Sequence, residues 1–383
     1  MFIDVKDLLA KYSLDELNRT ADEYFSTQVD NPYFLNKPFA SIDETPILLS
    51  HFAAALLMLE AFHSCRVLDF GAGAGWTSRM LAQTGCKVIS CDVSPAVLKI
   101  SQRAHLRAGD SIPNDSIEYL EFDGYALKIP DGSVDRILCM DAFHHVVNQE
   151  QLMSEFARVL VPGGLLVFSE PGPEHSATPQ SQSEMRTYTV VEQDFNVNEL
   201  NTIALKVGFV KGDAALYSPV PTIVPIDSVE ERLTNDLDLM GASTRAFHLN
   251  HRLVRFHKTG DRSEDSRRRD GLSATIEVLS EDNSEIKLRI TNVGRLRWLP
   301  SGEQVGSVNL GCHLLTENHE MLDFEFKRFP ISTSAVELGG SVDISIPFDA
   351  LKNSGGLVQF DLVAEQVAWL SWDGFSGPVI TAK

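Results

Sequence analysis

The sequence has little cysteine and no leader-like segment, and both absences narrow the choice of cellular compartment. Only five cysteines occur in 383 residues, and no two of them form a C-x-x-C pair. Because most of them lie within apolar, strand-like runs, we expect buried free thiols and a reducing compartment. Residues 1–7 lack the basic start and the apolar centre of a signal peptide. The sequence therefore predicts a cytoplasmic protein.

Basic residues are also scarce, which argues against two classes of partner. Lysine and arginine number 33 against 53 acids, so the net charge is −20 and the isoelectric point is about 4.9. Nucleic acids and anionic membranes require a basic surface, so we expect neither partner. The apolar stretch of residues 46–62 is interrupted by Ser50, His51 and Glu60. It is short for a membrane span, and we interpret it as a helix packed on a sheet edge or a ligand site.

The most informative feature that is present is a glycine-rich turn. Asp69 closes an apolar, strand-like run, Gly71, Gly73 and Gly75 alternate after it, and Trp76 begins a helix-like segment. Glycine permits backbone conformations closed to other residues and lets a ligand approach the main chain. The helix N-terminus that follows can hold an anion, and open α/β folds bind nucleotides at such turns. A dinucleotide fingerprint, G-x-G-x-x-G, would place its third glycine at Trp76.

Acids follow the next strand-like segments in order. Asp92 ends a strand over residues 87–91, about twenty residues past the loop, where such folds grip a ribose. Its two carboxylate oxygens suit a cis-diol. Asp123 ends a third strand, and Asp141 follows a fourth strand over residues 135–140.

This order of motifs resembles that of the class I S-adenosylmethionine (AdoMet) methyltransferases. Asp-x-Gly-x-Gly-x-Gly over residues 69–75 looks like motif I of that family. A helix over residues 149–160, a Pro-Gly-Gly stop at 162–164 and a strand over 165–169 continue the family's order. The resemblance covers about residues 65–171. It implies a Rossmann-like α/β domain with a mostly parallel, seven-stranded sheet whose last two strands are an antiparallel pair, and it implies AdoMet as the cofactor.

The resemblance also assigns the residues that bind the cofactor. The loop would wrap the methionine part, Asp69 would orient the loop and the amino group, and Asp123 would accept from the adenine amino group. The predicted cofactor-binding set is Asp69, Gly71, Ala72, Gly73, Gly75, Trp76, Asp92, Val93, Asp123, Gly124 and Asp141.

Four residues are candidates for catalysis. Methyl transfer needs aligned reactants, and a hydroxyl acceptor also needs a base. His144 and His145 come first, because histidine titrates near neutral pH, although such a pair often has a cofactor-side or packing role in the family. Glu170 comes second, either touching the acceptor or holding Mg²⁺ together with Asp141. We expect it to be a structural or solvated acid instead, and we predict no metal site.

The fourth candidate is His175, in a long polar connection that follows the fifth strand. Together with acids such as Glu184 and Glu192, it would hydrogen-bond a polyhydroxylated acceptor. The alternative is a solvated lid, since long loops at strand ends are often functional but also often mobile.

The length predicts two domains. Residues 1–64 form a helical lead-in, which either caps the cofactor or packs as plain helix and loop. Residues 65–258 form the catalytic core, with an inserted helix near 228–239 that covers the acceptor site or joins two copies into a homodimer. The charged residues 259–271 predict a linker, and residues 272–383 form a second domain.

The second domain changes to short β-rich runs between turn residues. Residues 285–290 alternate polar and apolar side chains, the mark of a half-buried strand. The pattern predicts an all-β, immunoglobulin-like sandwich and resembles modules appended to bacterial surface-polysaccharide enzymes. We expect Trp298 and Trp369 in its core, whereas Trp372 and Phe375 lie at a turn where a sugar ring would stack.

The combined interpretation is an AdoMet-dependent methyltransferase with a C-terminal β-sandwich. The appended module favours O-methylation of a sugar or surface-polysaccharide precursor. One alternative is a small-molecule or lipid-quinone C- or O-methyltransferase, because the core resembles those equally. A non-enzymatic alternative is a glycan-binding or assembly subunit whose AdoMet-binding core has lost turnover.

Overall fold

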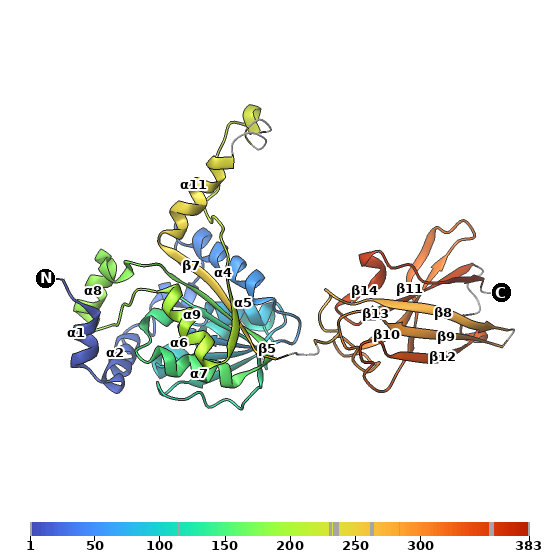
Figure 1. Cartoon of the computed structure of the whole chain (residues 1–383), viewed down its shortest axis with the longest axis horizontal. Coiled ribbons are helices and arrows are strands. Elements are labelled where there is room, and N and C mark those ends of the chain that lie inside the picture. Colours follow the sequence, from blue (N-terminus) through green and yellow to red (C-terminus); the bar gives the residue numbers. More distant parts are fainter. Residues whose placement is uncertain are drawn as a thin grey trace. The chain divides into compact units, whose positions relative to one another are not determined.

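The computed structural model describes residues 2–113, 115–229, 232, 237–260, 264–282, 284–351 and 356–381. The chain divides into two compact units (Figure 1). The first comprises residues 1–61 and 65–262, and the second comprises residues 62–64 and 263–383. Within the described residues, no helix combines the length and the hydropathy that crossing a membrane requires.

A seven-stranded sheet organises the first unit, in the order β3-β2-β1-β4-β5-β7-β6. The strands are β1 Arg66–Phe70, β2 Lys87–Asp92, β3 Ile117–Glu121, β4 Val134–Met140, β5 Leu160–Pro171, β6 Phe209–Ala214 and β7 His251–Lys258. β1 to β5 run parallel, while β7 is antiparallel to both β5 and β6. This mixed sheet confirms the predicted Rossmann-like architecture of the first unit.

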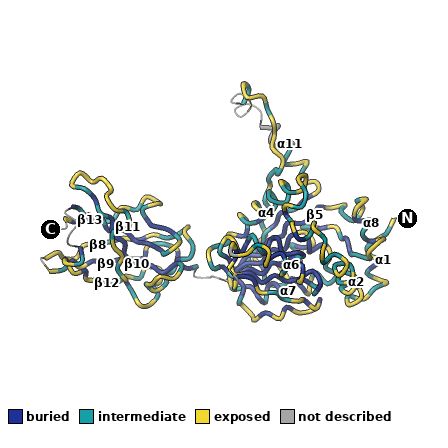
Figure 2. The backbone as a smooth tube through the Cα atoms, turned by 180° about the vertical axis from the view of Figure 1, so that it is seen from behind, coloured by how far each residue is buried: buried dark blue, intermediate teal, exposed yellow. Residues whose placement is uncertain are grey.

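The helices of the first unit that the structure describes are α1 Val5–Lys11, α2 Leu14–Ser26, α3 Pro32–Asn36, α4 Thr45–Leu59, α5 Trp76–Gln83, α6 Pro95–Ala108, α7 Gln149–Val159, α8 Pro179–Tyr188, α9 Val197–Val207 and α11 Leu237–His248. Some of them, α4, α5, α6, α7 and α9, contact the sheet, α2 and α3 pack on α6, and α11 extends away from the sheet (Figure 1). Every residue of β4 is buried, as expected for a central parallel strand covered on both sides (Figure 2). Phe143, Phe156 and Phe168 are among the fully buried side chains that fill the core.

Two local expectations differ from the structure. The polar connection after the fifth strand contains α8, whose start is capped by Thr178: its hydroxyl oxygen accepts from the Ser181 amide, and Pro179 occupies the first turn. The Pro-Gly-Gly stop at 162–164 lies inside β5, which already begins at Leu160. Gly163 has a φ of +70°, so the chain bends there without leaving the sheet. The helix expected near 228–239 falls partly outside the described residues.

The second unit consists mainly of two antiparallel sheets. One has five strands in the order β11-β10-β13-β14, with β15 paired to β13, and the other has the order β12-β9-β8. The strands are β8 Ala274–Glu281, β9 Glu285–Asn292, β10 Val308–Leu315, β11 Met321–Pro330, β12 Ser341–Pro347, β13 Leu357–Ala364, β14 Ala368–Trp369 and β15 Val379–Thr381. Both sheets contribute to one buried core. The immunoglobulin-like assignment and the likeness to polysaccharide enzymes stay predictions.

Several expectations for buried side chains are confirmed. Trp298 and Trp369 are buried in the second unit, whereas Trp372 is 56% exposed. All five cysteines are buried and free. Within the stretch predicted as a linker, Asp265 and Ser266 are buried, and the Ser266 amide donates to the Arg297 carbonyl at 2.9 Å. Charge alone did not indicate this, because ion pairs and backbone bonds hold these polar residues in the second unit.

Candidate functional site

One cavity of about 330 Å³ lies at the carboxyl ends of β1, β2 and β4. The glycine loop, the strand ends and the lead-in helices together form its wall. Predicted cofactor residues in this wall are Gly71, Ala72, Gly73, Trp76, Asp92, Val93, Gly124 and Asp141, and the lead-in adds Leu14, Leu17, Asn18, Tyr24, Phe25, Phe34 and Lys37. A nucleotide-sized ligand is thus expected where open α/β sheets bind one.

The three alternating glycines have separate reasons to be glycine. All three have positive φ, at 67°, 54° and 69° for Gly71, Gly73 and Gly75. A Cβ on Gly71 would lie 2.2 Å from the Ala142 Cβ, and one on Gly75 would lie 1.8 Å from the Ser101 hydroxyl oxygen. A Cβ on Gly73 would meet nothing within 4 Å. Gly71 and Gly75 therefore permit close packing, and Gly73 leaves backbone open to a ligand.

Asp69 holds the loop from behind and does not line the cavity. Its Oδ2 accepts hydrogen bonds from the hydroxyls of Thr77 and Ser78, at 2.7 and 2.5 Å. Both donors belong to the first turns of α5, so the acid fixes the start of that helix against β1. Burial raises the pKa of Asp69 to about 6, although the two hydroxyls act in the opposite direction.

Asp92 joins the glycine loop to the second strand and lines the cavity. Its Oδ2 accepts from the Gly73 amide at 2.9 Å, and its Oδ1 accepts from the Ser94 amide at 3.1 Å. Burial raises the pKa of this carboxyl, while these amides lower it. Each carboxylate oxygen keeps a further lone pair, which suits the predicted contact with a cis-diol.

Asp123 takes a different place from the one predicted. Its Oδ1 accepts from the Tyr125 and Ala126 amides at 2.9 and 3.0 Å, and these bonds lower its pKa. The cavity wall is formed instead by its neighbours Phe122 and Gly124. Aspartate often closes turns in this way, so an acid after a strand is a weak signal for adenine contact.

The lead-in helices are bonded to the same edge of the sheet. Asp22 in α2 accepts from the Ser94 hydroxyl at 2.7 Å and from the Ala96 amide at 2.8 Å, both at the start of α6. Tyr24 packs against Tyr188 of α8, with ring centroids 4.8 Å apart. The sequence predicted a cap here as one of two alternatives, but it did not single out these residues.

Asp141 ends the fourth strand with strained backbone and faces the cavity. Its φ is +51°, which a residue with a Cβ adopts only when its surroundings hold it. The protein atoms packed around Asp141, followed by the charge of Glu170, raise its pKa to about 6, although the residue is exposed to solvent by its accessible surface.

Glu170 is fully buried and does not line the cavity. It accepts from the amides of Ala142 and Phe143 at 3.0 and 2.9 Å and lies 2.7 Å from His144 Nδ1. Its carboxylate is therefore occupied in fixing the 3₁₀ turn η2 Phe143–His145, rather than touching an acceptor or joining Asp141 on Mg²⁺. Burial raises its pKa to about 7.

The neighbouring histidines differ in access. His145 lines the cavity, and its side chain is 39% exposed, with Nδ1 2.6 Å from the Val191 carbonyl oxygen. His144 is buried behind it and does not line the cavity. Burial lowers the pKa of His144 well below its usual range, so this ring is neutral. Among the four predicted catalytic residues, His145 is the one that lines the described cavity.

His175 lies in the 3₁₀ turn η3 His175–Ala177 and bonds to an acid outside the predicted site set. Its Nε2 is 2.8 Å from Glu192 Oε2. Burial opposes ionisation of Glu192, but His175, His145 and His144 lower its pKa to about 2. Glu192 follows α8 along the chain, so only the folded structure brings it to the histidines.

A second group of residues near Asp141 was not predicted. The rings of His51 and His251 stack with centroids 4.3 Å apart, and Tyr217 lies against the same cluster. His51 Nε2 and the Tyr217 hydroxyl are buried and have no hydrogen-bond partner among the described residues. Burial lowers the pKa of His51 and raises that of Tyr217, and the charge of Asp141 acts upward on both, so it opposes burial at His51 and adds to it at Tyr217.

Comparison with known proteins gives one family match and several relatives. A family model described as a methyltransferase domain matches residues 68–168. The demethylmenaquinone methyltransferase of Tropheryma whipplei (strain Twist) is 34% identical over 141 residues, which are 35% of this chain and 56% of that protein. The ubiquinone biosynthesis O-methyltransferase of Xanthomonas campestris pv. campestris (strain B100) is 29% identical over 156 residues, 41% of this chain and 59% of that protein. The chain thus spans somewhat more than half the length of these relatives.

A solved structure with partial likeness is the Haemonchus contortus phosphoethanolamine N-methyltransferase 2 in complex with S-adenosyl-L-methionine. It is 16% identical, the match covers 68% of this chain and 60% of that chain, and the TM-score is 0.43. At these values the likeness adds nothing on substrate or mechanism.

Proposed function

We propose, from the premise that residues 68–168 are a class I AdoMet-dependent methyltransferase domain, that this protein methylates a small acceptor beside Asp141 and His145. One observation carries the proposal: a single cavity of about 330 Å³ runs from the glycine loop to these two side chains. Cofactor and acceptor would therefore meet in one enclosed space, which supplies the alignment that methyl transfer needs.

Different residues of the protein would bind the cofactor, position the loop and take the proton of the acceptor. AdoMet supplies an electrophilic methyl group on a sulfonium sulfur. The glycine loop and Asp92 bind and orient the cofactor, and Asp69 holds the loop in place. Asp141 and His145 would border the acceptor at the end of the cavity away from the glycine loop, and His145 would take the proton from its hydroxyl group. Walls from α2, α3 and the chain after α8 exclude water from this step.

The acceptor we favour is a small, ring-bearing molecule of the phenol or quinol class. Leu17, Phe25, Phe34, Val146 and Val191 give the cavity an apolar wall, which suits such a ring. Relatives named for demethylmenaquinone and ubiquinone methylation support the same class. The sugar or surface-polysaccharide acceptor remains a prediction, because it rests on the β-rich unit alone.

The direct test is release of S-adenosylhomocysteine from AdoMet by the full chain, with phenols and quinols in one panel and nucleotide sugars in another. Turnover with a phenol or quinol would support the proposal, and turnover with nucleotide sugars alone would overturn the acceptor class. If calorimetry detects AdoMet binding and no acceptor reacts, the non-enzymatic alternative is favoured.

Variants of His145 test the assigned base. His145→Gln should lower kcat by roughly 10²–10⁴-fold, the usual range for a lost general base, with little change in AdoMet affinity. His257→Gln is the matched control, because His257 pairs with Asp213 on β6 and does not line the cavity. Equal turnover of both variants and the wild type would remove His145 from the mechanism.

A further inference from the structure

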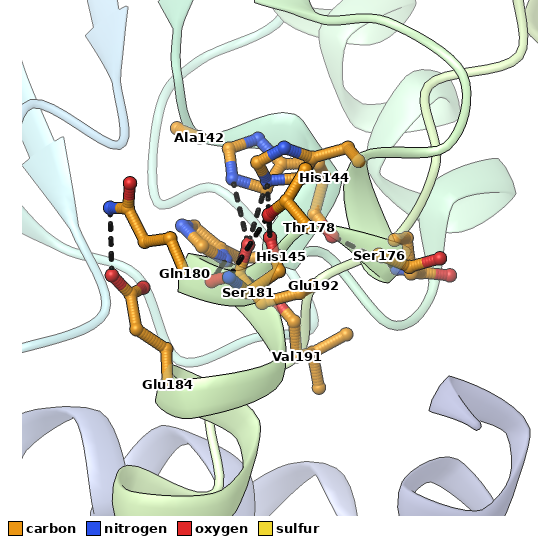
Figure 3. Close-up of polar contacts among 12 residues, drawn as sticks. Ala142, His144, His145, Ser176, Thr178, Gln180, Ser181, Glu184, Val191 and Glu192 are labelled. Carbon is orange, nitrogen blue, oxygen red and sulfur yellow. Dashed lines mark hydrogen bonds and ion pairs between the residues drawn. The ribbon is translucent and has the colours of Figure 1, made fainter. Parts of the chain in front are cut away.

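Three histidines and one glutamate from separate segments converge beside the cavity. His144 and His145 come from η2, and Glu192 follows α8 (Figure 3). His175 comes from η3. We propose that this cluster binds a divalent transition-metal ion of the zinc class, although the sequence predicted no metal site. The proposal does not depend on methyl transfer. A His145 ring whose Nδ1 binds the ion would carry its proton on Nε2, so ion binding and proton uptake from an acceptor would exclude each other on that ring.

The spacing of the donor atoms fits an ion better than direct contacts. His144 Nε2 lies 3.8 Å from Glu192 Oε2, and His145 Nδ1 lies 3.5 Å from Glu192 Oε1. These distances are too long for good hydrogen bonds. Two ligands of a tetrahedral zinc ion, each about 2.0–2.1 Å from the metal, lie about 3.3 Å apart. One donor atom from each of the three residues lies within 4.8 Å of the others, so small side-chain shifts would close the shell.

The partner of His144 fixes which of its nitrogens can bind the ion. Nδ1 lies 2.7 Å from Glu170 Oε2, and whenever this carboxylate is ionised it accepts, so Nδ1 then carries the proton. The Nε2 lone pair then faces Glu192, and two electron-rich atoms repel each other unless a cation lies between them. A carboxylate behind a histidine, with the far nitrogen free, is the usual support of a metal-binding imidazole.

The environment of Glu192 also favours a cation between it and the histidines. The residue is 2% exposed, and its Oε1 has no hydrogen-bond partner among the described residues. A buried carboxylate oxygen without a donor is costly, and a cation at the cluster would remove that cost. Its other oxygen is 2.8 Å from His175 Nε2, close enough for this nitrogen to become the fourth ligand.

The donor set also selects the ion. Imidazole and one carboxylate suit Zn²⁺, Co²⁺, Ni²⁺ or Fe²⁺, whereas Mg²⁺ and Ca²⁺ prefer oxygen shells. Ligating nitrogens must be unprotonated, so His145 Nδ1 and His175 Nε2, which now face the Val191 carbonyl and Glu192, would have to lose their protons. A neutral ring would move this proton to its other nitrogen, and a doubly protonated ring would release one proton to the solvent on binding.

The test is titration of the full chain, stripped by a chelator, with Co²⁺ and then Zn²⁺. We expect one ion per chain, visible-range absorption typical of tetrahedral Co²⁺, and proton release in calorimetry. Glu192→Gln should weaken binding at least 100-fold, and His145→Ala, which changes a half-exposed side chain, should weaken it also. Circular dichroism of each variant separates lost binding from lost folding.

Two further variants sharpen the result. Glu170→Gln should lower metal affinity roughly 10–100-fold, the usual effect of losing such a support, because its amide would face the Nδ1 proton of His144 and favour the other tautomer. His257→Gln, in a histidine–carboxylate pair elsewhere in the unit, should bind as the wild type does. If the wild type binds no ion, or binds it as Glu192→Gln does, the cluster is a hydrogen-bonded network only. No methyl acceptor enters this test, so its failure would leave the proposed function standing.

Discussion

The buried carboxyl of Asp69 should make the stability of the protein depend on pH, and the direction of this dependence follows from its raised pKa. The carboxyl is 1% exposed, and burial raises its pKa to about 6 from an unperturbed 3.8. A shift of about 2.2 units corresponds to about 3 kcal/mol at about 1.36 kcal/mol per unit. Because the folded-state pKa is raised, the stability linked to this group is fully present below pH 3.8 and is lost as pH rises through about 6.

Replacing Asp69 with asparagine removes this titration. The difference in unfolding free energy between Asp69→Asn and the wild type should therefore shift by up to about 3 kcal/mol in favour of the variant between pH 4 and 7. Any constant cost of weaker bonds to Thr77 and Ser78 cancels in that shift. Urea unfolding followed by circular dichroism at helical wavelengths measures it, because nearly all described helices lie in the first unit.

A second aspartate in the same unit gives a control of opposite sign. The amides of Ala126 and Tyr125 lower the pKa of Asp123, so its contribution is present above the unfolded pKa and is lost as pH falls through the lowered folded-state pKa. Asp123→Asn should lose relative stability as pH rises from acid. A flat difference curve for Asp69→Asn, or one that slopes as the control does, would refute the burial argument.

Three further changes test the binding of the cofactor. Gly71→Ala should abolish AdoMet binding in calorimetry, because its Cβ would lie 2.2 Å from that of Ala142; wild-type affinity would show that the loop can move away. Asp22→Ala should lower stability by about 1 kcal/mol through the lost cap of α6 and should weaken AdoMet binding, as read by thermal shift with and without ligand. AdoMet should bind more tightly at pH 7.5 than at pH 5.5, because the raised pKa of Asp141 leaves it partly neutral at the lower pH; equal affinities in Asp141→Asn would confirm the source.

The sequence predicted the parts of the fold and site that depend on neighbouring residues. The glycine loop and the acid of the second strand follow from motifs within a few residues of one another. The mostly parallel, seven-stranded sheet was implied by the family resemblance over about residues 65–171. Asp92 lines the cavity, because it is the last residue of β2 and the cavity lies at the carboxyl end of that strand. The role of Asp123 was harder to predict, because a carboxyl at a turn can bond its own backbone two residues on.

Contacts between segments that lie far apart in the sequence could not be predicted from sequence patterns. Glu170 and His144 are 26 positions apart, and their bond decides that one histidine is fixed while His145 remains accessible. Glu192 reaches the histidines only because α8 forms within a stretch that looked like a polar loop. An acid and a histidine in such a stretch predict hydrogen bonding in general, but not which pair meets.

Three acids near the cavity have raised pKa values, which affects both the stability of the ligand-free protein and the binding of the cofactor. The protein atoms packed around Asp69, Asp141 and Glu170 raise the pKa of each, so ionising these acids near neutral pH lowers the stability of the ligand-free protein. A stable fold retains such groups where a ligand compensates for them. AdoMet carries a sulfonium charge, and its demethylated product does not. Among these three acids, Asp141 alone lines the cavity. Under the proposed function, its ionised carboxylate would favour the sulfonium donor over the uncharged product.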